Sequence, residues 1–309
     1  MNQHQTPRKL RAGTLLKLSV LRAGFALGGH IAPRRTVDRA ARLFATPLAS
    51  SRSRARAVKV DGGMQRHEIE VNGQMIATYV WGDPAQEPYA LLAHGWSSFG
   101  LRFLPWISRL RETGFAVITF DQPGHGYSTG ELCTLPDFVN TIRAIGGRYG
   151  NAALAIGHSL GGAAVTLAQG EDWHAARIVV IAPPANMEAA AERFMRFVHL
   201  GYHLHEQFLG WHEQATGVNA RDLDVRRHVP ALGQPCLIVH DLDDFEVPWG
   251  EGELYARHWQ NAHLLTTQGL GHHKVLDAPE VMDAALAFAR GERVGNRIVA
   301  SPNLPYGLA

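Results

Sequence analysis

Cysteine is scarce in this sequence, which carries only Cys133 and Cys236 among its 309 residues. The two lie far apart and neither belongs to a Cys-x-x-Cys pair, so nothing supports a disulfide framework or a thiolate zinc site. A His-Glu-x-x-His motif is also absent. We therefore expect no metal and no organic cofactor, and a reducing, cytoplasmic location.

A strong excess of charge of either sign is absent as well, because the formal net charge is +2 and charged residues make up 19% of the chain. This balance does not indicate a nucleic-acid partner, and the body of the chain has no array of basic and aromatic residues. Hydrophobic residues make up 46%, which is enough to build the core of one large domain or two small ones.

The chain also lacks an uninterrupted apolar run of about 20 residues, the length that a membrane-spanning helix needs. The apolar stretch between Leu15 and Leu27 is broken by Lys17 and Arg22. The region around it is strongly basic, with Arg8, Lys9, Arg11, Lys17, Arg22, Arg34, Arg35, Arg39, Arg42, Arg52, Arg54 and Arg56. We interpret residues 1–60 as a partly apolar helical extension, with a polar linker at residues 50–56.

Two interpretations of this extension stay open. In the favoured one, amphipathic helices pack on the catalytic domain. In the other, residues 1–50 bind weakly to anionic lipid, which would make the protein peripheral at the inner face of a membrane.

From about residue 66, short apolar runs of strand length alternate with helical stretches. An Asn72-Gly73 turn predicts a hairpin of residues 67–71 and 74–81. The later runs cover residues 89–93, 116–120, 152–156, 178–182, 236–239 and 262–266. Strands that alternate with helices predict an α/β fold, here a doubly wound, mostly parallel sheet with an antiparallel N-terminal hairpin.

One interval breaks the alternation, because about fifty residues separate the sixth strand from the seventh. A structureless loop of that length is improbable, and the interval is rich in Phe, Leu and Trp. We therefore predict a small helical cap at residues 183–234, inserted in a catalytic domain of residues 61–295. Residues 296–309 are expected to form a C-terminal tail.

The chemistry begins at Gly157-His158-Ser159-Leu160-Gly161, a Gly-x-Ser-x-Gly motif between an apolar strand and an Ala-rich helix. This context predicts a nucleophile elbow, a sharp strand-to-helix turn that lifts the serine hydroxyl above the sheet. Gly157 and Gly161 leave space where a side chain would clash with neighbouring backbone. The helix N-terminus would let the Leu160 amide donate to an oxyanion.

A serine hydroxyl needs a general base, and in this order of motifs the base comes late in the chain. Residues 269–273, Gly-Leu-Gly-His-His, follow the last expected strand. We assign His272 as the base, because Gly269 and Gly271 allow a sharp turn just before it. His273 is the alternative.

The acid that orients the histidine should follow the strand at residues 236–239. We assign Asp244, which lies at the bend before Pro248. Asp241 and Asp243 remain alternatives, although both are expected to bind backbone amides in the turn.

The second oxyanion donor should come from the loop after residues 89–93, where Gly95 allows the Trp96 amide to point into the site. His94 is expected to support this loop from behind. The loop Asp-Gln-Pro-Gly-His-Gly-Tyr-Ser that begins at Asp121 is expected to border the site without a direct role.

These motifs together resemble the α/β-hydrolases, in the branch of small esterases and of lysophospholipase- or aminopeptidase-like enzymes. The matching pieces are HGW at His94, DQPGHGYS at Asp121, GHSLGG at Gly157, HDLDDFEVP at His240 and GLGHH at Gly269, within residues 66–291. The resemblance implies Ser159, Asp244 and His272 as the triad and the Trp96 and Leu160 amides as oxyanion donors. Asp241 departs from it, because the family often has glycine there.

The expected function is a serine hydrolase, specifically a carboxylesterase that cleaves small or medium-chain esters through an acyl-enzyme on Ser159. The alternatives are a lipid-directed lysophospholipase, a thioesterase or an amidase on the same triad. A non-catalytic binding protein on the hydrolase scaffold is the competing class. A serine at position 159 disfavours dehalogenase and epoxide hydrolase chemistry. The resemblance implies an aspartate nucleophile at this position for those two activities.

Overall fold

The structure, a computed structural model, describes residues 12–60 and 62–298. These residues form two compact units. One contains the described residues up to Phe44 together with Glu188–Ala220, and the other contains the described residues from Ala45 to Met187 and from Arg221 onward. Most of the expected tail, residues 299–309, lies outside the described residues.

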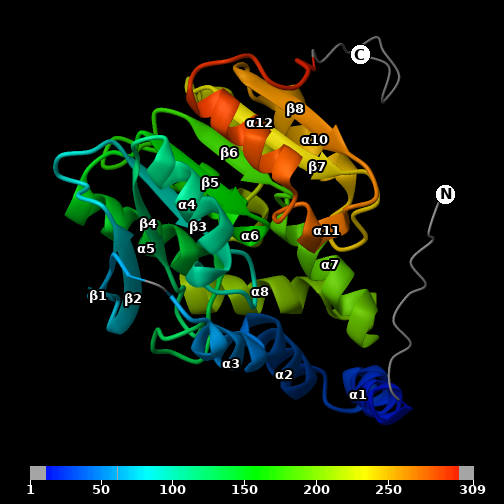
Figure 1. Cartoon of the computed structure of the whole chain (residues 1–309). Helices are drawn as coiled ribbons and strands as arrows, with labels where there is room; N and C mark the ends of the chain where they lie inside the picture. Colours follow the sequence, from blue (N-terminus) through cyan, green and yellow to red (C-terminus); the bar gives the residue numbers. More distant parts are fainter. Residues whose placement is uncertain (1–11, 61, 299–309) are drawn as a thin grey trace. The chain divides into compact units, whose positions relative to one another are not determined.

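The larger unit contains an eight-stranded sheet in the order β1-β2-β4-β3-β5-β6-β7-β8 (Figure 1). β1 and β2 form an antiparallel hairpin and β2 pairs antiparallel with β4, whereas all later neighbours are parallel. The strands are β1 Met64–Val71, β2 Gln74–Trp81, β3 Tyr89–Ala93, β4 Ala116–Phe120, β5 Leu154–His158, β6 Ile178–Ile181, β7 Cys236–Asp241 and β8 Ala262–Thr267. The α/β fold with an antiparallel hairpin is therefore confirmed.

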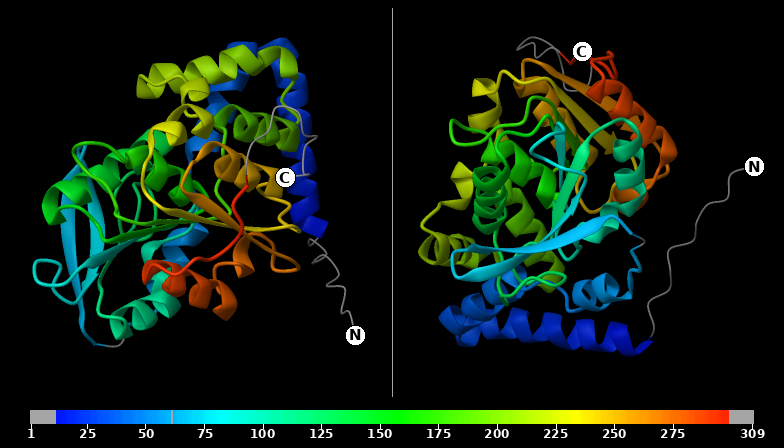
Figure 2. Two further views of the ribbon diagram at one scale, coloured as in Figure 1. Left: turned by 90° about the horizontal axis from the view of Figure 1, so that it is seen from above. Right: turned by 60° about the vertical axis from the view of Figure 1, so that its left-hand side comes forward.

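Helices cover both faces of this sheet (Figures 1 and 2). α4 and α12 lie on one face, and α5, α6 and α10 lie on the other. The helices of this unit are α3 Ser50–Ala57, α4 Leu104–Glu112, α5 Leu135–Tyr149, α6 Leu160–Ala168, α9 Val225–His228, α10 Trp249–His258, α11 Gly271–Lys274 and α12 Pro279–Ala289. Because parallel strands end at the same edge of a sheet, the loops after β3, β5, β7 and β8 converge at one edge.

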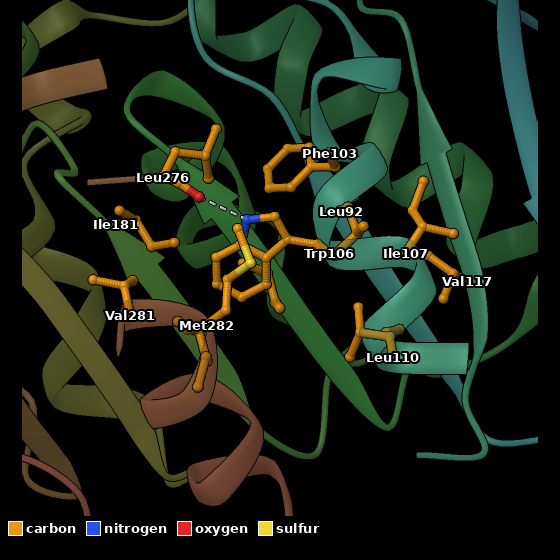
Figure 3. Packing of buried hydrophobic residues seen from close by; sticks show 14 of the residues in the cluster. Leu92, Phe103, Trp106, Ile107, Leu110, Val117, Ile181, Leu276, Val281 and Met282 are labelled. Atoms are coloured by element: carbon orange, nitrogen blue, oxygen red, sulfur yellow. Dashed lines mark hydrogen bonds between the residues drawn. The ribbon is translucent and has the colours of Figure 1, made fainter. Parts of the chain in front are cut away.

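The core on the α4 and α12 face is built around Trp106, which is almost fully buried (Figure 3). Its indole nitrogen donates to the Leu276 carbonyl over 2.8 Å, so the polar atom of the ring is satisfied. Met282 and Phe103 pack in the same cluster. This packing joins α4 to the segment that leads from α11 into α12.

The smaller unit contains α1 Ala12–Ile31 and α2 Pro33–Ala45 together with α7 Met187–Val198 and α8 His205–Thr216 of the segment between β6 and β7. The rings of Phe44, Phe194 and Phe208 pack together at centroid distances of 4.9–5.9 Å. The Trp211 indole donates to Asp38 over 3.0 Å. α2 thus packs against α7 and α8.

The grouping of residues differs from the expected 1–60 extension in one respect. The segment read as a polar linker is the helix α3, and it belongs to the unit that contains the sheet. Arg52 donates to the carbonyls of Ser128 and Gly130. The arginines of α3 thus donate to backbone carbonyl oxygens that lie far away in the sequence. Charge composition does not reveal such long-range hydrogen bonds.

Within residues 12–60 and 62–298, no helix is both long and apolar enough to cross a membrane.

Candidate active site

Ser159 occupies the tight turn between β5 and α6. It has a φ of +52°, a left-handed conformation that a non-glycine residue adopts only under constraint. A Cβ on Gly157 would lie 2.5 Å from the Gly161 carbonyl oxygen, and one on Gly161 would lie 2.3 Å from that of Ala93. Both positions therefore require glycine. β5 extends to His158, two residues beyond the expected end, because Gly157 and His158 pair with β6.

Ser159, His272 and Asp244 form one chain of hydrogen bonds. Nε2 of His272 lies 2.9 Å from Ser159 Oγ, and Nδ1 lies 2.7 Å from Asp244 Oδ2. Since a carboxylate can only accept, the proton of the neutral imidazole is on Nδ1 and Nε2 accepts from the serine hydroxyl. The chain joins the ends of β5, β7 and β8, and the side chains of His272 and Asp244 are buried.

Asp244 is held in its ionised form by the groups around it. Burial alone would raise the pKa of its carboxyl group, but hydrogen bonds from His240 and His272 and from the Val247 amide outweigh burial, and the pKa lies far below its usual range. Oδ1 accepts from the Glu246 and Val247 amides, each at 2.9 Å. Oδ2 is thereby left for His272.

The carboxylates of the other two aspartates accept hydrogen bonds from residues 267–271. Asp241 accepts from the Leu270 and Gly271 amides over 3.1 and 2.9 Å and also from the Thr267 hydroxyl. Asp243 accepts from the Gly269 amide over 3.0 Å. Both hold the turn that carries His272.

The turn itself depends on two left-handed glycines, because Gly269 has a φ of +84° and Gly271 a φ of +64°. His272 then lies in the single helical turn α11. The neighbouring His273 points elsewhere, since its side chain is 71% exposed and pairs with Glu246 at 2.9 Å.

Of the expected oxyanion donors, Leu160 follows Ser159 directly in the chain, and Trp96 follows Gly95 in the loop that approaches the elbow. Within the part of the chain that the structure describes, the amides of Trp96 and Leu160 donate no hydrogen bond. A Cβ on Gly95 would lie 2.8 Å from that of Ser159, so only glycine lets this loop approach the elbow so closely.

Two buried histidines shape the loop that carries Trp96. His94 Nε2 accepts from the Gln122 amide and Nδ1 donates to the Gly95 carbonyl. His125 Nε2 accepts from the Ser97 amide, and His125 Nδ1 donates to the Pro123 carbonyl. His94 thus links this loop to Gln122, and the loop that begins at Asp121 takes part through His125, which was expected to have no direct role.

Residues before the sheet also hold this loop. The Leu48 amide donates to Ser97 Oγ over 2.9 Å, and Arg54 donates to the Ser97 carbonyl over 2.6 Å. Ser97, which follows Trp96, has a φ of +52°. The segment around α3 therefore fixes Ser97, the residue next to the expected oxyanion donor Trp96. In the sequence, only the high arginine content of this segment indicates that it binds elsewhere in the protein.

The neutral histidines make stability depend on pH. Burial lowers the pKa of His94 to about 4 and those of His125 and His158 to about 3. An unfolded histidine titrates near 6.5, so between these values the unfolded chain binds protons that the folded chain does not. We expect the free energy of unfolding to fall by about 1.4 kcal/mol per histidine for each pH unit below about 6.5.

Urea unfolding at pH 7, 6 and 5 measures this effect. His125→Gln should make the pH dependence shallower, because glutamine can accept from the Ser97 amide without titrating. A midpoint that is the same at the three pH values would contradict the assignment of neutral buried histidines.

Among the described side chains, no three His, Cys, Asp or Glu residues are placed to hold a metal ion.

Comparison with solved structures identifies the fold. An esterase from Exiguobacterium antarcticum superposes with a TM-score of 0.56 at 17% identity, over 73% of this chain and 100% of its own. An esterase from Rhodococcus sp. ECU1013 gives 0.55 at 16%, over 75% and 100%. A bacterial membrane phospholipase A described as a virulence factor gives 0.57 at 19%, over 90% and 98%.

Among curated proteins, no sequence matches this chain significantly. The sequence model of one family does match, over residues 90–285, which is well over half of the chain. The chain therefore belongs to the alpha/beta hydrolase family.

Proposed function

We propose that this hydrolase is a serine carboxylesterase that forms an acyl-enzyme on Ser159. The observation that carries the proposal is the chain of hydrogen bonds from Ser159 Oγ through His272 to Asp244, at 2.9 and 2.7 Å. The positive φ of Ser159 supports the proposal. Such a backbone conformation costs free energy in a non-glycine residue, and residues of this kind cluster at active sites.

In the first half-reaction, Ser159 Oγ attacks the ester carbonyl carbon while His272 Nε2 takes the hydroxyl proton. The carbonyl oxygen becomes an oxyanion that accepts from the Trp96 and Leu160 amides. Asp244 stabilises the imidazolium that forms. Collapse of the intermediate breaks the bond to the leaving alkoxide oxygen, and His272 donates the proton taken from Ser159 to that oxygen.

In the second half-reaction, His272 takes a proton from water, whose oxygen attacks the acyl carbon. The second tetrahedral intermediate uses the same two amides. Its collapse releases the carboxylic acid and returns the proton to Ser159. Removing one donor from such a pair costs about 10²–10³-fold in rate in related chemistry, so both amides matter.

A fluorophosphonate tests the proposal directly, because it phosphonylates an activated serine and leaves ordinary serines unmodified. The wild-type chain should gain one label and lose esterase activity, and Ser159→Ala should not react. Ser108→Ala, which changes an exposed serine of α4, is the matched control and should label as the wild type does. Absence of labelling of the folded wild type would instead favour a non-catalytic binding protein.

A lipid ester is the second candidate substrate, with lysophospholipase activity on the same triad. It is favoured by the solved phospholipase A, which aligns with 90% of this chain, whereas the two esterases align with 73% and 75%. Rates on p-nitrophenyl esters of increasing acyl length, compared with those on a lysophospholipid, a thioester and an anilide, separate these candidates from thioesterase and amidase activity.

A further inference from the structure

Helix α1 carries an apolar stripe that faces away from its own unit. Leu16, Val20, Ala23, Leu27 and Ile31 follow one another at spacings of four, three, four and four residues, which places them on one side of a helix. Leu16, Val20, Leu27 and Ile31 are 67%, 65%, 65% and 82% exposed. Large apolar side chains gathered on one exposed face indicate a binding surface, whereas scattered ones do not.

The opposite side of α1 fixes which face is exposed. Phe25 is buried, and a Cβ on Gly29 would come within 3.2 Å of the Leu204 side chain in the same unit. Arg22 donates to the Phe197 carbonyl over 2.8 Å and lies over the Phe197 ring at 5.1 Å. The helix therefore cannot bury the stripe by rotating about its axis without losing these contacts.

Charge indicates what covers the stripe. The first acidic residue of the chain is Asp38, and the segment before it contains seven basic residues, Arg8, Lys9, Arg11, Lys17, Arg22, Arg34 and Arg35. Lys17 on α1 and Arg34 and Arg35 just beyond its end are exposed. Two copies of the chain that met through this stripe would bring these cations together without carboxylates of the same segment to offset them. An anionic lipid surface offsets them directly.

We propose that the stripe formed by Leu16, Val20, Ala23, Leu27 and Ile31 is a membrane-binding surface for anionic bilayers. α1 lies in the plane of the interface, its apolar side chains enter the boundary between headgroups and acyl chains, and Lys17, Arg34 and Arg35 reach the lipid phosphates. This proposal does not depend on the hydrolase activity.

Flotation of the full-length chain with vesicles tests it. The chain should bind vesicles of phosphatidylcholine and phosphatidylglycerol and bind poorly to phosphatidylcholine alone. Raising NaCl from about 0.05 to 0.5 M should weaken binding at least about tenfold, because exposed charges are screened over a shorter distance. The triple variant Leu16→Gln, Val20→Gln, Leu27→Gln should weaken binding by at least about tenfold through lost apolar burial.

The matched control changes exposed leucines outside the stripe, Leu43→Gln with Leu48→Gln, and should bind as the wild type does. Because Cys133 and Cys236 are buried, a thiol-reactive environment-sensitive dye can be placed at Leu27→Cys or Leu43→Cys alone. The dye at position 27 should shift to shorter wavelength on anionic vesicles, and the dye at position 43 should not.

Three outcomes would overturn the proposal. The first is no binding to anionic vesicles, and the second is equal binding by the stripe variant and the control. The third is a wild-type dimer in solution that does not bind vesicles and that becomes monomeric in the stripe variant but not in the control. Equal urea midpoints of the wild type and the stripe variant verify that the substitutions leave folding intact.

Discussion

Replacing His272 with alanine should lower kcat for ester hydrolysis by about 10⁵–10⁶-fold and change KM little. Among the described residues, the His272 imidazole is the one group within hydrogen-bond distance of Ser159 Oγ that can take its proton. Its Nε2 lies 2.9 Å from that oxygen. Without it, the serine must be deprotonated by water at neutral pH. Substrate binding depends on other surfaces, so the loss should appear in kcat. Stopped-flow or long-time assays with a p-nitrophenyl ester measure it.

The adjacent histidine provides the matched control. His273 has the same chemistry and lies one residue away, but its side chain is 71% exposed and pairs with Glu246. His273→Ala should retain kcat to within a few-fold. Ser159→Ala should lose as much as His272→Ala, and the double variant should lose no more than either, because the two residues act as a unit. A loss in His273→Ala that matches that of His272→Ala would refute the assigned base.

The elbow could be predicted from sequence because its chemistry is local. A strand, two glycines around a serine and a small-residue helix follow one another within a few turns of chain, and each glycine is required by a backbone contact shorter than 3 Å. The sheet could be predicted for a similar reason. Buried parallel strands are short continuous apolar runs, and six of the eight strands start at the residue at which their runs begin.

His272 could be placed because the two glycines before it have to adopt left-handed conformations, which sequence shows directly. The acid was harder to assign, since three aspartates within four residues carry the same functional group. What distinguishes the three carboxylates is their hydrogen-bond donors. Asp241 and Asp243 accept from backbone amides of residues 269–271, whereas Asp244 accepts from the imidazole of His272. That difference arises from pairing between two distant loops.

Long-range contacts also explain what sequence reasoning missed. Ser97 accepts hydrogen bonds from Leu48 and Arg54, more than forty residues earlier, and its own amide donates to His125. No spacing rule connects these positions. His240, which lies 3.5 Å from Asp244 in the buried site, is equally hidden, because a histidine inside an apolar strand has the sequence signature of any core residue.

Replacing Asp244 with asparagine should lower kcat by about 10⁴-fold while the fold is retained. The physical reason is the direction of each hydrogen bond. Asp244 Oδ1 accepts from the amides of Glu246 and Val247, so the carbonyl oxygen of the asparagine must take that place. Its amide NH₂ then faces His272 Nδ1 and can only donate.

His272 must respond by accepting at Nδ1, which moves its proton to Nε2, the atom that faces Ser159. An Nε2 that carries a proton has no free lone pair with which to accept another from the serine, and no carboxylate remains to stabilise an imidazolium. The matched control is Asp243→Asn, which changes an exposed aspartate of the same loop whose carboxylate accepts from the Gly269 amide; it should retain kcat within about tenfold. Equal rates for Asp244→Asn and Asp243→Asn would show that the tautomer of His272 does not limit the reaction and that the acid lies elsewhere.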